Sequence, residues 1–267
     1  MEHIRLIASD LDGTLFPINS TALPAETKAL VARLIARGVD FCAASGRCYL
    51  NMRDLFHGVQ GPITYISANG SAVYRDGEPL WLCAFSAGDM AILRRFIAGF
   101  QPDWLPVFAG SGAEQVFLRL EEGGPAYDRD CFAPITDGPC VYHECFDRLP
   151  AGTLTKLSVY MPGPDKSRLL AGLGEEAARF SVAMSGGNYI DLMPRGVDKG
   201  AALGRLMTRQ GLRPEEVLVF GDSENDAEML ALTPNSYAME GSAPPALAAA
   251  RHTCADVREV LRPLAEA

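Results

Sequence analysis

Short apolar runs alternate with amphipathic segments in the first 70 residues. An apolar run at residues 3–10 ends in acidic residues and a glycine, which is typical of a buried strand that leads into a loop. Apolar residues recur at helical spacing within residues 24–37. The runs at 39–44 and 63–67 predict two further buried strands, with a helix between them at 49–56. This order of elements predicts right-handed crossovers and a parallel sheet.

The same alternation returns near the carboxyl end. Apolar runs at residues 217–220 and 235–239 predict two more strands. Helices are predicted around these strands at residues 198–210, 223–232, 244–250 and 256–264. We therefore interpret the two ends as halves of one doubly wound, mainly parallel α/β domain.

The middle of the sequence follows a different pattern. A predicted helix at residues 86–100 precedes strand-like runs that polar residues, glycines and prolines interrupt. These runs lie at residues 105–108, 115–120, 156–161, 180–184 and 189–193. We predict an α+β module with its own sheet, inserted at residues 83–187 into a discontinuous domain formed by residues 1–82 and 188–267.

Composition and charge exclude several classes of protein. The 267 residues are 48% apolar and 21% charged, which is ordinary for a globular protein and excludes wholesale disorder. No apolar stretch approaches the roughly 18 residues of a membrane helix, and the amino-terminal segment lacks the features of a signal peptide, so we expect a cytoplasmic protein. The net charge of −9 argues against broad nucleic-acid binding, but not against a small anionic substrate. No apolar stripe predicts an oligomeric state.

Cysteine usage agrees with this interpretation. The seven cysteines are scattered, and the sequence contains no CxxC pair. An odd count without a secretory signal favours reduced thiols over disulfides or a zinc site.

Two acidic clusters follow predicted strands in different halves of the sheet. Asp10 and Asp12 lie in the run DLDGT, two residues apart, so an extended backbone directs both carboxylates the same way. Asp222 lies in the second cluster, GDSEND. Like charges repel unless a cation compensates them, and Mg²⁺ prefers oxygen ligands. Asp10, Asp12 and Asp222 therefore predict a magnesium site, whereas a solvated acidic turn and a helix cap are the structural alternatives.

Two further motifs favour an anionic ligand. Ser45 and Gly46 follow the second predicted strand and lead into a helix, an arrangement that suits a phosphate cradle. Lys199 lies at the start of a predicted helix, where its positive charge is unfavourable because the helix dipole is also positive at that end. A bound phosphate would compensate both positive charges. Arg47 follows the glycine, and a ligand contact and a surface ion pair remain equal alternatives for it.

Taken in order, the motifs DLDGTL, ASGR, SANG, GVDKG and GDSENDAEM give the chain a family resemblance. It resembles the haloacid dehalogenase superfamily of phosphohydrolases, and within it the Cof-type branch (subfamily IIB), nearly from end to end. The resemblance implies a Rossmann-like core and an inserted α/β cap of the C2 type, which closes over the site and selects the substrate.

The resemblance also implies roles for the acidic residues. Asp10 is expected to be the nucleophile that forms an aspartyl-phosphate. Asp12 is expected to protonate the leaving oxygen and then to deprotonate the hydrolytic water. Mg²⁺ is expected to be held by the Asp10 carboxylate, the Asp12 backbone carbonyl and Asp222. Asp226 is expected to order the water shell of the metal and Lys199 without binding the metal itself.

The phosphoryl group is expected to be gripped by Ser45, Gly46 and Lys199, with Asn225 as a further contact. The segment SGGN, at residues 185–188, is a candidate substrate loop, and Asn188 and Arg47 are the candidate specificity residues. A plain tight turn is the alternative for residues 185–188.

We therefore expect a Mg²⁺-dependent phosphatase of small phosphorylated metabolites. Sugar phosphates are the leading substrate class, and pyridoxal phosphate or flavin mononucleotide are others. A phosphomutase with the same intermediate is an alternative that would yield isomerised product instead of free phosphate. A non-catalytic metabolite-binding protein would show ligand-dependent thermal shifts without turnover. A dehalogenase is disfavoured, because a halide leaving group needs no proton from Asp12.

Overall fold

The chain divides into two units that differ in their sheets. A computed structural model describes residues 3–18, 20, 22–100, 104–110, 115–118, 140–143, 152–184 and 188–266. One unit consists of Met1–Trp81 and Asp198–Ala267, and the other of Leu82–Val197. The first is therefore discontinuous in sequence.

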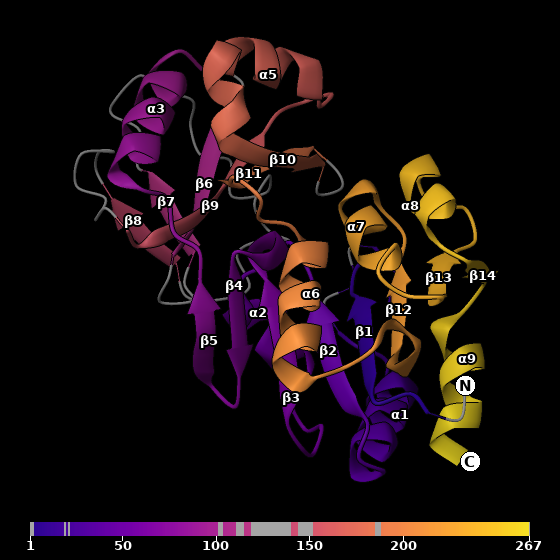
Figure 1. Ribbon diagram of the computed structural model, residues 1–267. Helices are drawn as coiled ribbons and strands as arrows, with labels where there is room; N and C mark the ends of the chain where they lie inside the picture. The colour runs from indigo at the N-terminus through magenta and orange to yellow at the C-terminus, as the bar shows by residue number, and fades with distance from the viewer. Residues whose placement is uncertain are drawn as a thin grey trace. The chain divides into compact units, whose positions relative to one another are not determined.

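The first unit is built on an eight-stranded sheet with the strand order β14-β13-β12-β1-β2-β3-β4-β5 (Figure 1). Neighbouring strands from β14 to β3 are parallel, and β4 is antiparallel to β3. The strands are β1 (Leu6–Asp10), β2 (Asp40–Ala44), β3 (Ile63–Ser67), β4 (Ala72–Arg75), β5 (Glu78–Leu82), β12 (Val217–Gly221), β13 (Asn235–Met239) and β14 (His252–Cys254). Every residue of β1, β3 and β12 is buried, which is why these strands read as continuous apolar runs. The predicted fold class is confirmed.

Helices cover this sheet and bury its apolar side chains. Along β1, Leu6 and Ala8 belong to a core cluster with α6 (Lys199–Gln210), α7 (Ala227–Leu230) and α8 (Pro244–Ala249). Alternate residues such as Ile7 point to the opposite face of the sheet. The remaining helices of the unit are α1 (Ala25–Ala36), α2 (Tyr49–Leu55) and α9 (Val257–Glu266), of which α1 and α9 pack together.

The hairpin formed by β4 and β5 was not predicted. Asp76 and Gly77 connect the two strands, and both have positive φ, 54° and 88°. An Asp-Gly pair with positive φ at both positions is the usual sequence of a tight two-residue hairpin turn. The signal was therefore present in the sequence, and it adds an antiparallel edge to an otherwise parallel sheet.

The second unit has a six-stranded sheet in the order β10-β11-β9-β6-β7-β8. Its strand pairs are antiparallel except for β7 with β8. Among the described residues, the strands are β6 (Leu105–Gly110), β7 (Gln115–Leu118), β8 (Cys140–His143), β9 (Leu154–Tyr160), β10 (Phe180–Met184) and β11 (Tyr189–Pro194), and the α-helices are α3 (Ala87–Ala98) and α5 (Lys166–Leu173). Leu93 of α3, Leu169 of α5 and Leu157 of β9 share one buried apolar cluster.

Polar residues in this second sheet form a buried pair. Lys156 on β9 donates to Asp191 on β11 at 2.7 Å, and Ser158 donates to the other carboxylate oxygen at 2.5 Å. These side chains occupy positions between the apolar residues of the same strands, so the polar interruptions of the sequence pattern form a satisfied network.

The structure moves the second unit boundary and divides one predicted helix. The boundary lies between Val197 and Asp198, later than the predicted residue 188, because β11 pairs with β9 and β10. The helix predicted at residues 223–232 is a 3₁₀ turn, Glu224–Asp226, followed by the short α7, because the Asp226 side chain accepts backbone hydrogen bonds at the turn. Residues 185–187 of the candidate substrate loop and residues 119–120 of the predicted strand at 115–120 lie outside the described residues.

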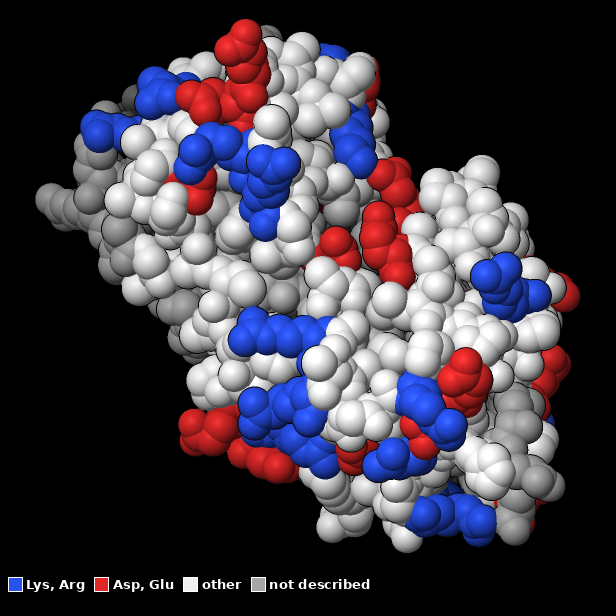
Figure 2. Space-filling view, in the orientation of Figure 1, with Lys and Arg blue, Asp and Glu red and all other residues white. Residues whose placement is uncertain are grey.

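Two surface properties bear on the expected partners. None of the described helices is both long and apolar enough to cross a bilayer. On the face seen in Figure 2, the described Lys and Arg side chains lie among Asp and Glu side chains instead of forming one continuous basic band.

Candidate functional site

The site residues of the first unit lie where parallel strands end. Asp10 is the last residue of β1 and pairs in register with Ala44, the last residue of β2. On the other side of β1, Ser9 is opposite Phe220 of β12. The loops that begin after β2 and β12 therefore flank Asp10, as expected for ligand sites in open α/β sheets.

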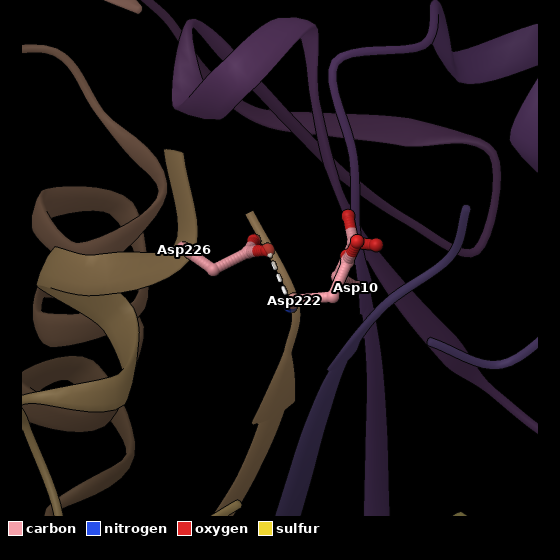
Figure 3. Close-up of side chains that lie close together, drawn as sticks. All are labelled: Asp10, Asp222 and Asp226. Atoms are coloured by element: carbon pink, nitrogen blue, oxygen red, sulfur yellow. Dashed lines mark hydrogen bonds between the residues drawn. The ribbon is translucent and has the colours of Figure 1, made fainter. Parts of the chain in front are cut away.

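Three carboxylates converge at this edge (Figure 3). Asp10, Asp222 and Asp226 each have an oxygen within 4.8 Å of one another. Asp226 comes from the 3₁₀ turn, and one of its oxygens accepts the backbone N–H groups of Asp222 and Ser223, both at 3.0 Å. The loop after β12 is thereby folded around the Asp226 carboxylate, which brings Asp222 towards Asp10.

Lys199 supplies a buried cation to this cluster. Its Nζ donates to Asp10 Oδ1 at 2.6 Å and to Asp226 Oδ1 at 2.7 Å, and its side chain is only 1% exposed. Lys199 is the first residue of α6, and the helix is capped by Asp198, whose side chain accepts the N–H of Ala201 at 2.6 Å. The cap fixes the start of the helix and with it the lysine.

The electrostatics of the cluster favour an additional cation. Burial raises the pKa of Asp10 well above its usual value; Lys199 opposes this shift, and the charges of Asp226 and Asp222 reinforce it. Burial and the charge of Asp226 likewise raise the pKa of Asp222. Burial alone disfavours a charged lysine, yet Asp10 and Asp226 together hold the pKa of Lys199 above its usual value. Fully ionised, three carboxylates and one ammonium leave two negative charges in excess, which suits a divalent cation.

Asp222 is oriented by two hydroxyl groups. Thr14 Oγ1 donates to Asp222 Oδ1 and Ser223 Oγ donates to Oδ2, both at 3.1 Å. Gly13 makes this approach possible, since it has a φ of +87° and a Cβ at this position would lie 2.6 Å from Asp222 Oδ2. From the sequence, the threonine of the DLDGT motif was considered only as a helix cap, whereas in the structure it orients Asp222.

The side chain of Asp12 points into a different interaction. Arg47 donates to both of its carboxylate oxygens, Nε to Oδ2 at 2.8 Å and Nη2 to Oδ1 at 2.6 Å. The Asp12 carboxylate is therefore not one of the three carboxylates of the cluster. For Arg47, the sequence had left a ligand contact and an ion pair as equal alternatives, and the structure shows an ion pair.

Ser45 and Asn225 are held through the SANG turn, residues 67–70. The backbone N–H of Asn69 donates to the carbonyl of Ser45 at 3.0 Å. The side-chain oxygen of Asn69 accepts a hydrogen bond from Nδ2 of Asn225, also at 3.0 Å. Ala68 and Asn69 both have positive φ, 49° and 55°, a strained conformation that is concentrated at functional sites. Asn225 Nδ2 carries two N–H donors, and the bond to Asn69 uses one of them, so a phosphate contact through the second stays a prediction. Asn69 was not among the predicted site residues, and a local motif gives no sign of a partner so distant in sequence.

Asn188 lies in the second unit, immediately before β11. Its carbonyl accepts the N–H of Met161 at 2.8 Å, and its side-chain Nδ2 lies 3.5 Å from the hydroxyl of Tyr160. Its role in specificity remains a prediction.

A close helix contact sets the position of Lys199 and gives a first testable prediction. A Cβ on Gly200 would lie 2.6 Å from the backbone carbon of Glu228 in α7. We expect Gly200→Ala to push α6 away from α7, to lower the free energy of unfolding by about 1–3 kcal/mol, and to reduce kcat by displacing the adjacent lysine. Thermal unfolding and steady-state kinetics measure both effects.

Gly204→Ala is the matched control, because a Cβ at Gly204 on the same helix meets nothing within 4 Å. We expect that variant to keep wild-type activity and to gain up to about 1 kcal/mol, since alanine favours a helix. Equal behaviour of the two variants would contradict the proposed constraint.

Comparisons with known proteins agree with this arrangement. A family model described as haloacid dehalogenase-like hydrolase matches residues 7–101 and 141–261. The chain belongs to this family. An HMP-PP phosphatase of Serratia proteamaculans is 32% identical over 245 residues, covering 90% of this chain and 85% of the relative. A 5-amino-6-(5-phospho-D-ribitylamino)uracil phosphatase of Escherichia coli is 26% identical over 255 residues, covering 93% and 90%.

A solved structure supports the fold. A protein from Streptococcus mutans superposes with a TM-score of 0.82 at 24% identity, covering 98% of this chain and 97% of that one. The family match and the phosphatase relatives identify the chain as a Cof-type haloacid dehalogenase-like phosphatase, a phosphoric monoester hydrolase.

Proposed function

We propose that this phosphatase uses Mg²⁺ and an aspartyl-phosphate intermediate to hydrolyse small phosphorylated metabolites in the cytoplasm. The observation that carries the proposal is the buried cluster of Asp10, Asp222 and Asp226 around Lys199 at the ends of β1 and β12. A nucleophile, excess negative charge and a fixed cation lie together there, which is what phosphoryl transfer requires.

Asp10 is the nucleophile in this proposal. Its carboxylate attacks phosphorus in line, and the bond from phosphorus to the leaving oxygen breaks with its electron pair on that oxygen. The leaving oxygen takes a proton from Asp12. Water then attacks phosphorus, the bond to Asp10 breaks, and Asp12 takes the proton from the water. The products are the alcohol and inorganic phosphate.

The residues present fit a magnesium ion. Asp222 offers a carboxylate held in place by Thr14 and Ser223, and Asp10 offers the oxygen that does not accept from Lys199. The Asp12 carbonyl completes the protein ligands that we propose, and Asp226 holds Lys199 and the loop. When bound, Mg²⁺ would neutralise charge on the phosphoryl oxygens and offset the repulsion between the acids.

The phosphoryl group is proposed to bind between Lys199 and the loop after β2. Ser45 is buried, its backbone N–H donates to the carbonyl of Ile66, and its Oγ accepts the N–H of Arg47. Because Ser45 Oγ accepts that N–H, its own O–H is the donor that we propose for the phosphate, and Gly46 is a further proposed contact. Asn225 is a further proposed contact, through the N–H of its amide nitrogen that does not donate to Asn69.

Sugar phosphates are the substrate class that we propose first. The Escherichia coli relative is named for a phosphorylated ribityl compound, which supports a phosphorylated polyol as part of the substrate. The HMP-PP phosphatase relative supports HMP-PP as the next compound to test, together with the phosphorylated cofactors expected from the sequence.

The magnesium requirement can be tested by two readouts. We expect phosphate release to stop in excess EDTA and to return with Mg²⁺, and we expect Mg²⁺ alone to raise the unfolding temperature by mass action. In Asp222→Asn both responses should need at least about tenfold more Mg²⁺, because a charged ligand is lost.

Asp54→Asn is the control, since Asp54 is exposed and pairs only with the neighbouring Arg53 among the contacts described. Full activity in EDTA, or an unchanged magnesium response in Asp222→Asn, would refute the proposed metal site.

A further inference from the structure

The paired hydrogen bonds between Arg47 and Asp12 join the residue proposed as general acid to the loop after β2. Nε and Nη2 of Arg47 meet the two carboxylate oxygens at 2.8 and 2.6 Å. Such a fork fixes the plane of a carboxylate as well as its distance, which a single ammonium group does not achieve. The side chains are 19% and 31% exposed, so the pair borders solvent and is not a core ion pair.

The backbones on both sides of this pair are anchored. The Arg47 N–H donates to Ser45 Oγ at 3.2 Å, and the Arg47 carbonyl accepts the N–H of Ala68 at 2.8 Å. On the other side, the N–H of Gly13 donates to the carbonyl of Phe16 at 2.8 Å, which closes the loop that carries Asp12. The guanidinium also lies over the Phe16 ring, 5.6 Å from its centre. Arg47 and Asp12 are therefore held in one geometry from two separate loops.

We infer that Arg47 is a positioning residue, which orients the Asp12 carboxyl group for proton transfer to and from the reacting oxygens. The inference rests on the proposed function, in which Asp12 carries that proton. A carboxylate has about four lone-pair sites, and the fork uses two of them. The remaining lone-pair sites then keep a fixed direction. Proton transfer takes place from one orientation of the Asp12 carboxyl group instead of from several side-chain rotamers.

This assignment differs from the specificity role first considered for Arg47. A direct phosphate anchor would have its donors directed at the phosphoryl position, whereas two of the Arg47 donors are directed at Asp12. The two roles predict different kinetics. Loss of an anchor weakens binding of every phosphate ester equally, but loss of a positioning residue matters only where the leaving group needs a proton.

The test therefore compares two leaving groups. The phenolate of 4-nitrophenyl phosphate leaves readily without a proton, whereas the alkoxide of glycerol 2-phosphate does not. For Asp12→Asn we expect kcat on glycerol 2-phosphate to fall at least about 100-fold, with a much smaller fall on the aryl ester. For Arg47→Ala we expect the same selective pattern, about tenfold or more on the alkyl ester. Arg47→Lys should recover part of this loss, and Asp12→Asn/Arg47→Ala should lose no more than Asp12→Asn alone.

Retained activity on the aryl ester shows that each variant is folded. Arg53→Ala, which removes an exposed arginine nearby on α2, should match the wild type on both substrates. Equal losses on both esters with a raised KM in Arg47→Ala, or additive losses in the double variant, would overturn the positioning role while leaving the proposed function intact. If Asp12→Asn itself shows no dependence on the leaving group, the proposed proton step fails and this role of Arg47 fails with it.

Discussion

Asp10→Asn is expected to lower kcat for phosphate release by about 10⁴-fold or more without unfolding the protein. The amide cannot attack phosphorus, so no covalent intermediate forms. The fold should tolerate the change, because burial and two neighbouring acids raise the pKa of Asp10 against the opposing effect of Lys199, and Lys199 keeps its ion pair with Asp226 in the variant. A carboxyl group with a raised folded-state pKa costs stability as the pH rises through that pKa, and asparagine removes this cost. At neutral pH in EDTA, the unfolding temperature of Asp10→Asn should therefore equal or exceed that of the wild type.

Asp76→Asn is the matched control for Asp10→Asn. Asp76 lies in the β4–β5 turn with an exposed side chain, and asparagine also accepts positive φ. Undiminished turnover in a folded Asp10→Asn protein would eliminate Asp10 as the nucleophile, whatever other residues do.

Lys199→Met is expected to have the largest effect on stability. The substitution leaves the carboxylates of Asp10 and Asp226 buried without their cation, and breaking a buried pair in this way costs about 3–5 kcal/mol. Urea unfolding in EDTA measures the loss. Turnover should also fall by at least about 100-fold, because the phosphoryl group loses a charged donor.

The loss of stability in Lys199→Met should depend on pH and should shrink below neutral pH. Since the pKa of Lys199 is raised in the folded state, its contribution is fully present at and below neutral pH and is lost only as the pH rises through that raised pKa. In the variant, however, falling pH protonates Asp10, whose pKa burial already raises, so the deficit relative to the wild type should shrink below neutral pH. Lys28→Met is the control, because Lys28 donates to a backbone carbonyl at an exposed position. A Lys199→Met protein as stable as that control would contradict the electrostatic description of the site.

The sequence predicted those features of the site that follow from the positions of the strands in the sheet. Asp10 and Asp222 follow apolar runs that had to be buried strands, and parallel strands place such residues at one edge of the sheet. The helix that begins at Lys199 was also predicted, although its 2.6 Å contact with Asp10 depends on how closely α6 approaches α7 at Gly200.

Side-chain pairings were beyond prediction, because they depend on loop geometry. The Arg47–Asp12 pair and the Asn69–Asn225 pair join separate loops, and each of these side chains has several reachable partners. The turn at Glu224–Asp226 replaced a predicted helix because a carboxylate with three donors competes with helical backbone bonds. Similarly, Lys156 and Asp191 read as polar interruptions of strands, whereas in the structure each satisfies the other.

A phosphate-release screen over about a hundred phosphorylated metabolites tests the central claim most directly. The wild type and Asp10→Asn are compared with Mg²⁺ and in EDTA, and both free phosphate and isomerised product are measured. We predict that the wild type releases phosphate from one or more compounds, sugar phosphates first, only with Mg²⁺, and that Asp10→Asn releases none. Release that persists in EDTA or in Asp10→Asn would contradict the account, as would isomerised product without free phosphate.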